Sequence, residues 1–318
     1  MKSPPETWQI GNHRVRVSHL AKLYWPEDGI TKGDLLGYYR LVAPVMLPYL
    51  KDRPVTMHVF PGGIHGFSYY RRDRPQGAPR WLRSAVYQPE TTEGITDLLL
   101  IDDAAGLIWL ANRGSIEFHM WNSRVPDLSQ PDLAVFDLDP GGEASFADVL
   151  RAALRLREAL ERRGLHGYPK TSGRRGLQVY LPLVPGYTFD VVRTWVKLIA
   201  EQLASAYPDL IAVPHGPTHQ GRRVAVDYAQ NSVGRNTVVP YSVRAQPGAP
   251  VSTPVHWGEV EDARFRPDDL TLRVVPHRLQ QLGDLFAPIL WSAEDIGLAN
   301  LDDHDDGHAN SDGHNHPP

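Results

Sequence analysis

The sequence contains no cysteine among its 318 residues. Without cysteine the chain has no disulfide framework, no thiol nucleophile and no Cys-ligated zinc or iron–sulfur site. It also lacks any apolar run close to the roughly 18–20 residues that span a bilayer. Its first residues, which include Pro4 and Pro5, do not form the apolar core of a signal peptide. These absences predict a soluble, cytoplasmic protein that does not act on a membrane.

A net charge of −4 is low for a protein that binds nucleic acid, but the acidic charge is concentrated at one end. Residues 302–318 hold five aspartates and no Lys or Arg, which leaves 33 basic and 32 acidic residues in the rest of the chain. Local basic patches, not the total charge, decide phosphate binding. A solvated arginine-rich surface gives the same composition, so both interpretations stay open. The arginines cluster at three places: Arg71, Arg72 and Arg74; Arg174 and Arg175; Arg222 and Arg223.

Hydrophobic periodicity and capping residues predict both helices and strands. The expected helices cover residues 33–50, 146–163 and 190–207, with Thr31 and Ser145 as N-caps of the first two. The expected strands cover residues 54–60, 115–120, 133–138, 177–183 and 223–228. The elements do not alternate regularly, so we predict an α+β fold.

Two aspartates follow the apolar run of residues 133–136, at positions 137 and 139. Side chains alternate along a strand, so Asp137 and Asp139 share a face while Leu138 points into the core. Two adjacent carboxylates are costly unless a cation lies between them, and oxygen-only ligands suit Mg²⁺ or Mn²⁺. Asp227 ends a second apolar strand and can supply the third ligand of a two-metal phosphoryl-transfer site. A strand-terminal turn in which aspartates cap backbone amides is the alternative.

Between these strands, the segment 168–180 places two arginines between glycines. Ser172, Gly173, Arg174, Arg175 and Gly176 suit a tight turn whose amides and guanidinium groups hold phosphate oxygens. The segment does not have the G-x-x-x-x-G-K-[ST] pattern of a Walker A loop. A plain basic hairpin turn accounts for it equally well.

Taken together, the motifs resemble one family: the polymerase domain of bacterial DNA ligase D, in the archaeo-eukaryotic primase superfamily. The resemblance covers residues 13–284 and rests on the joint order of the motifs. It implies a primase-like core of mixed and antiparallel sheets flanked by helices over residues 1–300, followed by a disordered His- and Asp-rich tail at 301–318. The motifs are Gly29-Ile30-Thr31-Lys32-Gly33-Asp34, Tyr38-Tyr39, Arg53-Pro54, residues 102–107, Glu117-Phe118-His119, Phe136-Asp137-Leu138-Asp139-Pro140, Thr171-Ser172-Gly173, Asp227-Tyr228-Ala229-Gln230-Asn231 and Pro240-Tyr241-Ser242-Val243-Arg244.

The resemblance also implies an activity: gap filling and 3′-end extension with dNTPs or NTPs during non-homologous end joining, using Mn²⁺ or Mg²⁺. The metal-binding and catalytic residues would be Asp137, Asp139 and Asp227. The nucleotide site would contain His119, Ser172, Arg175, Arg235 and Arg244, with Tyr69 and Tyr70 stacking on bases. Lys22 and Lys32 would hold the 5′-phosphate of gapped DNA. The resemblance implies a Ku-like end-binding protein as a partner. A separate DNA ligase is also expected, because the sequence has no ligase lysine motif.

Several positions depart from the family's pattern. Arg175, Arg223 and Arg235 stand where lysine is usual, which keeps the charge and changes its geometry. His58 replaces a lysine, Gln178 replaces a histidine and Gln220 replaces an arginine. Two alternatives to a polymerase therefore stay open: a DNA-end-binding module with little polymerase activity, and a metal-dependent phosphoesterase or nuclease.

Overall fold

Two β-sheets organise the chain in the computed structural model, which describes residues 5–88, 94–214 and 221–297. The five-stranded sheet is antiparallel except for its last pair and has the order β11 (Tyr168–Thr171), β12 (Leu177–Pro182), β10 (Leu133–Pro140), β14 (Val224–Asp227), β13 (Ile211–Ala212). The four-stranded sheet is antiparallel throughout and has the order β15 (Asn236–Val238), β9 (Ser115–Trp121), β5 (Val55–Val59), β6 (Tyr69–Arg71).

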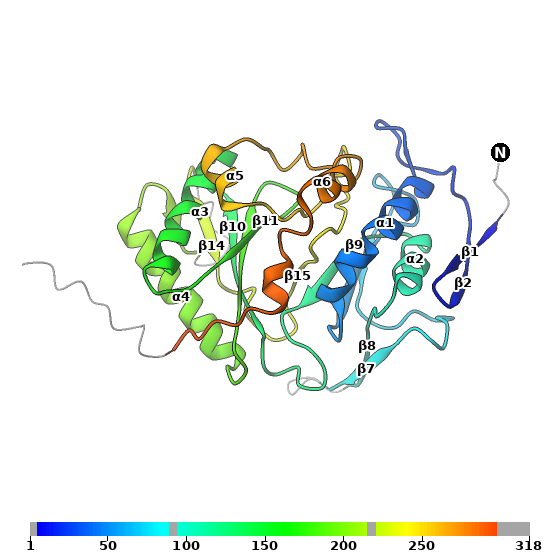
Figure 1. Cartoon of the computed structure of the whole chain (residues 1–318), viewed down its shortest axis with the longest axis horizontal. Coiled ribbons are helices and arrows are strands. Elements are labelled where there is room, and N and C mark those ends of the chain that lie inside the picture. The colour runs from blue at the N-terminus through cyan, green and yellow to red at the C-terminus, as the bar shows by residue number, and fades with distance from the viewer. Residues whose placement is uncertain (1–4, 89–93, 215–220, 298–318) are drawn as a thin grey trace, which may run out of the picture.

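Helices flank both sheets (Figure 1). Two long helices, α3 (Phe146–Glu161) and α4 (Phe189–Ala206), pack on β10 of the five-stranded sheet. On the other side of the molecule α1 (Lys32–Leu50) packs on α2 (Ala104–Asn112), which contacts β9. The shorter helices are α5 (Trp257–Asp262), α6 (Val275–Leu282) and the 3₁₀ helix η1 (Ala287–Leu290). Within the described ranges, no helix has the length and apolar character that crossing a bilayer requires.

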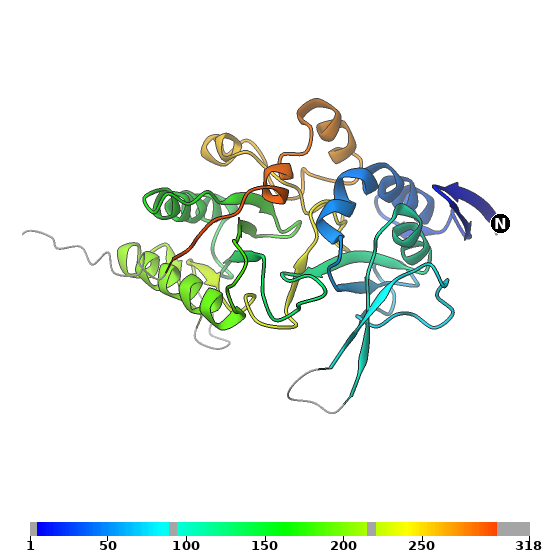
Figure 2. The same ribbon diagram turned by 60° about the horizontal axis from the view of Figure 1, so that its bottom comes forward.

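Three two-stranded hairpins complete the fold: β1 (Glu6–Ile10) with β2 (His13–Val17), β3 (Leu23–Trp25) with β4 (Ile30–Thr31), and β7 (Ser84–Tyr87) with β8 (Thr96–Leu99). The β7–β8 hairpin extends away from the body of the molecule, as Figure 2 shows. The β3–β4 hairpin leads directly into α1 and so places residues before the helix beside its first turn.

Local sequence explains where the two best-capped helices begin. Thr31 Oγ1 accepts a hydrogen bond from the Asp34 amide at 3.1 Å, and Asp34 accepts one from the Thr31 amide at 2.8 Å. Ser145 and Asp148 form the same reciprocal capping box at the start of α3. The predicted α+β class is confirmed, and the predicted helices and strands are present with ends that differ by one or two residues. Pro140 is the last residue of β10, where its missing N–H ends the ladder.

Two features connect the sheets. The first is the buried Arg53, which precedes β5 and forms two 2.6 Å hydrogen bonds with Asp132, the residue before β10. The second is the segment 239–255: Val239 donates to Phe118 of β9, and Thr171 of β11 donates to Thr253 at 2.8 Å. One continuous apolar core runs through both sheets and their helices. The predicted tail, 301–318, lies outside the described residues.

Candidate active site

The three aspartates singled out in the sequence lie on one face of the five-stranded sheet. β10 and β14 are antiparallel, and Asp137 lies directly opposite Asp227 in their register. Directly opposed residues project from the same face, and Asp139 shares that face because it is two positions from Asp137. Leu138, between them, is fully buried. The fold therefore gathers carboxylates from two strands that are far apart in sequence.

The electrostatics of this face favour a bound cation. Burial and the charge of Asp139 raise the pKa of Asp137 to about 8, and burial and the charge of Asp227 raise the pKa of Asp139. Asp137 Oδ1 is buried and has no hydrogen-bond partner. A divalent ion would relieve both the repulsion and the unpaired oxygen, and an all-oxygen donor set fits Mg²⁺ or Mn²⁺. Among the described residues, no three His, Asp or Glu side chains are grouped closely enough to hold a metal ion as they stand.

The loop after β14 fixes the third aspartate. Asp227 Oδ1 accepts a 2.8 Å hydrogen bond from the Ala229 amide, and Gln230 donates to its other oxygen at 3.3 Å. Asn231 is buried and pairs with both backbone groups of Val135 in β10, each at 2.8 Å. The Asn231 side-chain amide thus pairs with β10 as the backbone of a neighbouring strand would. This pairing links the Asp227 loop to the strand that carries Asp137.

The arginine turn (residues 171–176) joins β11 to β12 next to the aspartates. Ser172 Oγ accepts hydrogen bonds from the amides of Arg174 and Gly176, at 3.3 and 3.1 Å, so the predicted site serine also holds the turn together. Gly173 has φ +67°, a conformation that favours glycine. A Cβ atom at Gly176 would lie 2.5 Å from the Leu138 carbonyl and 3.1 Å from Asp139 Oδ1. The turn therefore lies in direct contact with the end of β10.

The two arginines of the turn point in different directions. Arg175 donates to the carbonyls of Gly141 and Ala144, at 3.2 and 3.4 Å. Arg174 extends the other way, and its guanidinium lies 3.4 Å from Glu117 Oε1. The charge of Arg175 has no carboxylate partner among the described residues, so it is available to an anion.

Glu117, on β9 of the four-stranded sheet, lies at the centre of a second group of polar side chains. This group, formed with His58, His119 and Arg244, is called the Glu117 wall. Glu117 is fully buried, and its carboxylate contacts His119 at 3.1 Å, Arg244 Nε at 3.3 Å and the Ala245 amide at 2.9 Å. Burial alone would raise the pKa of Glu117, but hydrogen bonds from His119 and His58 and the charge of Arg244 hold this pKa well below its usual range. Arg244 also donates to the Ser172 carbonyl at 2.9 Å, which joins this wall to the arginine turn.

Sequence reasoning gave no role to Glu117, although its motif was noted. The available signal was a carboxylate inside an otherwise apolar strand, two residues from His119 and hence on the same face. Nothing local in the sequence shows that Arg244, 127 positions later, supplies its positive charge. The contact comes from the segment 239–255 that crosses between the sheets.

The two predicted stacking tyrosines do not share a face. Tyr70 is 59% exposed, stacks on His58 with ring centres 4.0 Å apart, and lies edge-on to His119 at 6.0 Å. Tyr69 instead stacks on the exposed Phe67 at 5.7 Å. Consecutive strand residues alternate, so only one member of the pair can face the His119 pocket. Tyr70 is that residue, and Phe67 is an exposed aromatic to which sequence reasoning gave no role.

The predicted 5′-phosphate lysines are neighbours. The Lys32 amide donates to the Lys22 carbonyl at 2.8 Å, and the two ammonium groups donate to the carbonyls of Ser18 and Pro61 at 2.7 Å. Lys32 is 4% exposed, and burial together with the charge of Lys22 lowers its pKa to about 8. Neither lysine has a carboxylate partner in the part of the chain described here. Two close cations without a carboxylate partner, at a helix N-terminus, favour an anion nearby.

Two other predicted positions do not join the cluster. Arg235 lies before β15 and is exposed, and its side chain forms no hydrogen bond or ion pair with other described residues. Structure therefore does not bring it to Ser172, Arg175 or Arg244. Gln220 lies outside the described residues.

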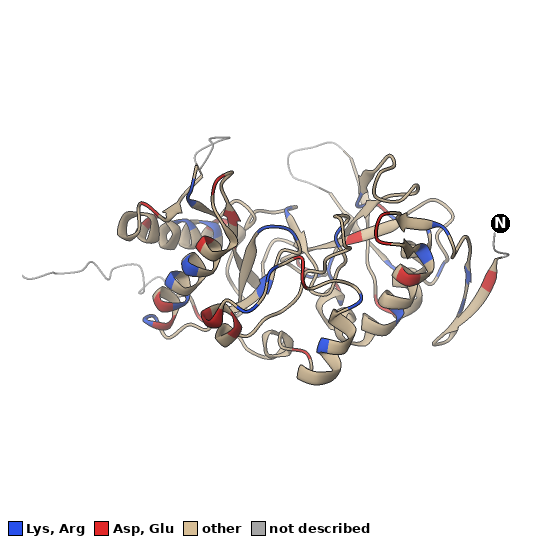
Figure 3. Cartoon of the chain, turned by 90° about the horizontal axis from the view of Figure 1, so that it is seen from above, with Lys and Arg blue, Asp and Glu red and all other residues tan. Residues whose placement is uncertain are grey.

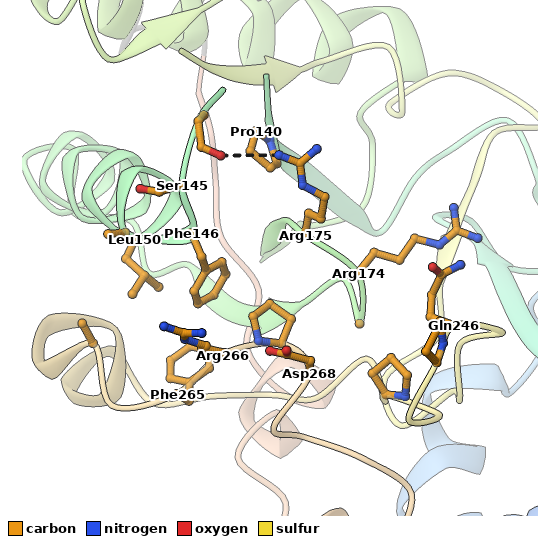
Figure 4. A pocket seen from close by; sticks show the side chains of 17 residues that line it. Pro140, Ser145, Phe146, Leu150, Arg174, Arg175, Gln246, Phe265, Arg266 and Asp268 are labelled. Carbon is orange, nitrogen blue, oxygen red and sulfur yellow. Dashed lines mark hydrogen bonds between the residues drawn. The ribbon is translucent and has the colours of Figure 1, made fainter. Parts of the chain in front are cut away.

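A cavity of about 640 Å³ adjoins the arginine turn (Figure 4). Its volume is in the range of small-molecule sites. In Figure 4, Arg175 extends toward Pro140 and Arg174 toward Gln246, while Phe146 and Phe265 lie on the other side. Figure 3 shows further basic segments on the loops in the middle of the molecule, whereas the outer helices carry both signs of charge. The cavity lining itself holds Arg174, Arg175 and Arg266 with Asp268, an excess of positive charge that favours an anionic ligand.

Known proteins are similar to this chain in sequence and in fold. A sequence profile of the family described as LigD, primase-polymerase domain, matches residues 31–286. The multifunctional non-homologous end joining protein LigD of Mycolicibacterium smegmatis is 31% identical over 278 residues, which are 87% of this chain and 36% of that protein. The bifunctional LigD of Bacillus subtilis is 29% identical over 289 residues, 91% of this chain and 46% of that protein. The chain spans less than half the length of these two relatives.

Among solved structures, the polymerase domain of Mycobacterium tuberculosis ligase D in complex with DNA superposes with a TM-score of 0.82. The two sequences are 31% identical, and the match covers 88% of this chain and 99% of that domain. The fold and the aspartate-bearing site therefore define a nucleotidyltransferase domain of the primase-like class. The chain belongs to the LigD primase-polymerase family.

Proposed function

We propose that this protein extends DNA 3′ ends and fills gaps at broken DNA, with dNTPs or NTPs as substrates, in non-homologous end joining. The observation that carries the proposal is the register of β10 and β14, which sets Asp137 opposite Asp227 beside the arginine turn. The DNA complex of the M. tuberculosis domain supports DNA as the substrate. The end-joining names of the relatives support the pathway. The partners in this proposal are those that the resemblance implies, a Ku-like end-binding protein and a DNA ligase, at the nucleoid.

In this mechanism the primer 3′-hydroxyl attacks the nucleotide α-phosphate and pyrophosphate leaves. Asp137, Asp139 and Asp227 would hold Mn²⁺ or Mg²⁺, which when bound supplies activation of the hydroxyl and charge neutralisation for the leaving group. Arg175 and Arg244 offset triphosphate charge from two directions, and Glu117 keeps Arg244 in place. The cavity that Arg174 and Arg175 line would receive the polyphosphate. Arg235 does not line this cavity and has no role in the proposed mechanism.

The remaining residues position the two substrates. Tyr70 offers an exposed ring on which the incoming base stacks, next to His119. Lys22 and Lys32 hold the 5′-phosphate on the far side of a gap, which fixes how far the 3′ end lies from the aspartates. Such positioning accelerates the reaction by holding the hydroxyl near the α-phosphate.

The test is a gel assay on gapped DNA with a 5′-phosphate, supplied with Mn²⁺ and either dNTPs or NTPs. We expect extension by the parent protein and a loss of about 10³-fold or more for Asp227→Asn, with DNA retardation preserved. Asp209→Asn, an exposed aspartate before β13, serves as the matched control and should extend normally. Retardation without extension would indicate an end-binding module, and shortened DNA would indicate a nuclease. Either result would contradict the proposal.

A further inference from the structure

Lys170, on β11 beside the aspartates, is the most deeply buried cation near the site, and the proposed mechanism does not use it. It is fully buried, and its ammonium donates to Gln178 Oε1 at 2.7 Å and to Ser252 Oγ at 2.6 Å. Within the described chain it forms no ion pair with a carboxylate. Burying a lysine without an ion-pair partner costs desolvation free energy. An apolar side chain would therefore be more stable at this position unless the ammonium has a functional role.

The lysine determines which way the Gln178 amide faces. The two ends of an amide have nearly the same shape, so packing alone does not fix their orientation. An ammonium group only donates hydrogen bonds, so the atom that faces it must be the amide oxygen. The Tyr180 hydroxyl also donates to this oxygen, at 3.5 Å. The NH₂ end of Gln178 must therefore point away from Lys170.

Ser252 prevents the lysine from adopting other arrangements. Its hydroxyl donates to the Thr171 carbonyl at 2.8 Å and therefore presents a lone pair to Lys170. Thr171 begins the arginine turn, and Ser252 belongs to the segment that crosses between the sheets. The direction of each hydrogen bond in this chain is thus fixed: Ser252 donates to the Thr171 carbonyl, and Lys170 donates to both Ser252 and Gln178.

Gln178 lies directly opposite Asp137 in the β10–β12 register, so the two side chains project from the same face of the sheet. Gln178 also partly offsets the raised pKa of Asp137, as an N–H donor near a carboxylate does. With its oxygen on Lys170, only the NH₂ end can reach Asp137. The other carboxylate oxygen, Oδ1, is the buried atom that has no partner. The arrangement therefore occupies one side of Asp137 with an N–H donor and leaves one oxygen for a cation.

We propose that Lys170 is a positioning residue for the metal site, acting through Gln178 to orient the Asp137 carboxylate toward a divalent cation. The inference rests on the proposed function, because it takes Asp137 as a metal ligand. It also gives a role to Gln178, which stands where the family pattern has histidine. Without Lys170 the amide is free to turn its oxygen to Asp137, and the repulsion between the two oxygens rotates the carboxylate away from the cation.

The test is Mn²⁺ binding by calorimetry in the absence of DNA and nucleotide, on Lys170→Met, Gln178→Met and the double variant. We expect each single change to weaken Mn²⁺ affinity about tenfold and the double variant to bind no more weakly than Gln178→Met. The exposed Lys197→Met on α4 is the control for loss of a lysine charge and should leave the affinity unchanged. Unchanged affinity in Lys170→Met, or losses that multiply in the double variant, would overturn the proposal.

Asp137→Asn separates this inference from the proposed function. If this variant binds Mn²⁺ as the parent does, the metal assignment itself fails. If it loses Mn²⁺ while Lys170→Met retains it, only the role of Lys170 fails. If Lys170→Met does not fold, NMR of the parent protein decides instead. The Gln178 side-chain NH₂ resonances should shift on Mg²⁺ addition when that end faces Asp137, and unchanged resonances would contradict the inference.

Discussion

In the proposed function, Lys32 makes DNA binding depend on pH. Its lowered pKa, about 8, results from burial and from the neighbouring charge of Lys22. The ammonium is therefore charged below pH 8 and loses its proton as the pH rises above that value. We expect the advantage of 5′-phosphorylated over 5′-hydroxyl gapped DNA to be greatest below pH 8 and to decline at higher pH. The charged contact is worth about 1.5–3 kcal/mol, roughly ten- to more than a hundredfold in affinity.

Fluorescence anisotropy with the two DNAs from pH 6.5 to 9.5 measures this dependence. Lys32→Ala provides the comparison, because it should have a small phosphate preference that does not change over the same range. A parent protein whose preference is constant with pH, or a Lys32→Ala variant that still follows the parental profile, would assign the phosphate pocket to other residues.

At the scale of single elements, the arginine turn depends on a glycine that touches β10. A methyl group at Gly176 would meet the Leu138 carbonyl at 2.5 Å, so the turn would have to move away from Asp139. We expect Gly176→Ala to reduce primer extension more than tenfold and to cost about 1–3 kcal/mol of unfolding free energy. Gly142→Ala is the matched control, since a Cβ atom there would meet nothing within 4 Å. Equal activity of the two variants would show that the turn need not touch β10.

The elements themselves could be predicted because their signals are local. Thr31 with Asp34, and Ser145 with Asp148, form capping boxes that can be recognised from spacing alone. Period-two alternation likewise placed Asp137 and Asp139 on one face, and it also separates Tyr69 from Tyr70, although the sequence reasoning treated these two as a pair. Contacts between distant segments had no such signal. Glu117 with Arg244, and Lys170 with Ser252, meet only because the segment 239–255 crosses between the sheets.

At the scale of the whole molecule, Arg53 is the main polar connection between the two sheets. It is buried, pairs with both oxygens of Asp132 and donates to the Trp121 carbonyl at 3.2 Å. We expect Arg53→Met to cost about 3–5 kcal/mol in urea unfolding, because it leaves Asp132 with only Arg124. Arg83→Met removes a half-exposed arginine that also has two carboxylate partners, and should cost about 1 kcal/mol or less. Similar losses in the two variants would mean that Arg53 contributes no more than a half-exposed ion pair and that other contacts hold the sheets together.

The Arg53–Asp132 connection also limits how the enzyme can move during its reaction cycle. The aspartates and the arginine turn lie on one sheet, and the Glu117 wall with Tyr70 belongs to the other. Because the sheets share one core and are linked by Arg53 and Asp132, we expect the two walls to keep their spacing when a nucleotide binds. Adaptation to differently shaped broken ends must then come from loops, from projecting hairpins such as β7–β8 and from side chains such as Tyr70. A mismatched or distorted DNA 3′ end would bind between walls of the same spacing as a paired end. Whether its hydroxyl reaches the aspartates would then depend on the flexibility of the DNA end itself.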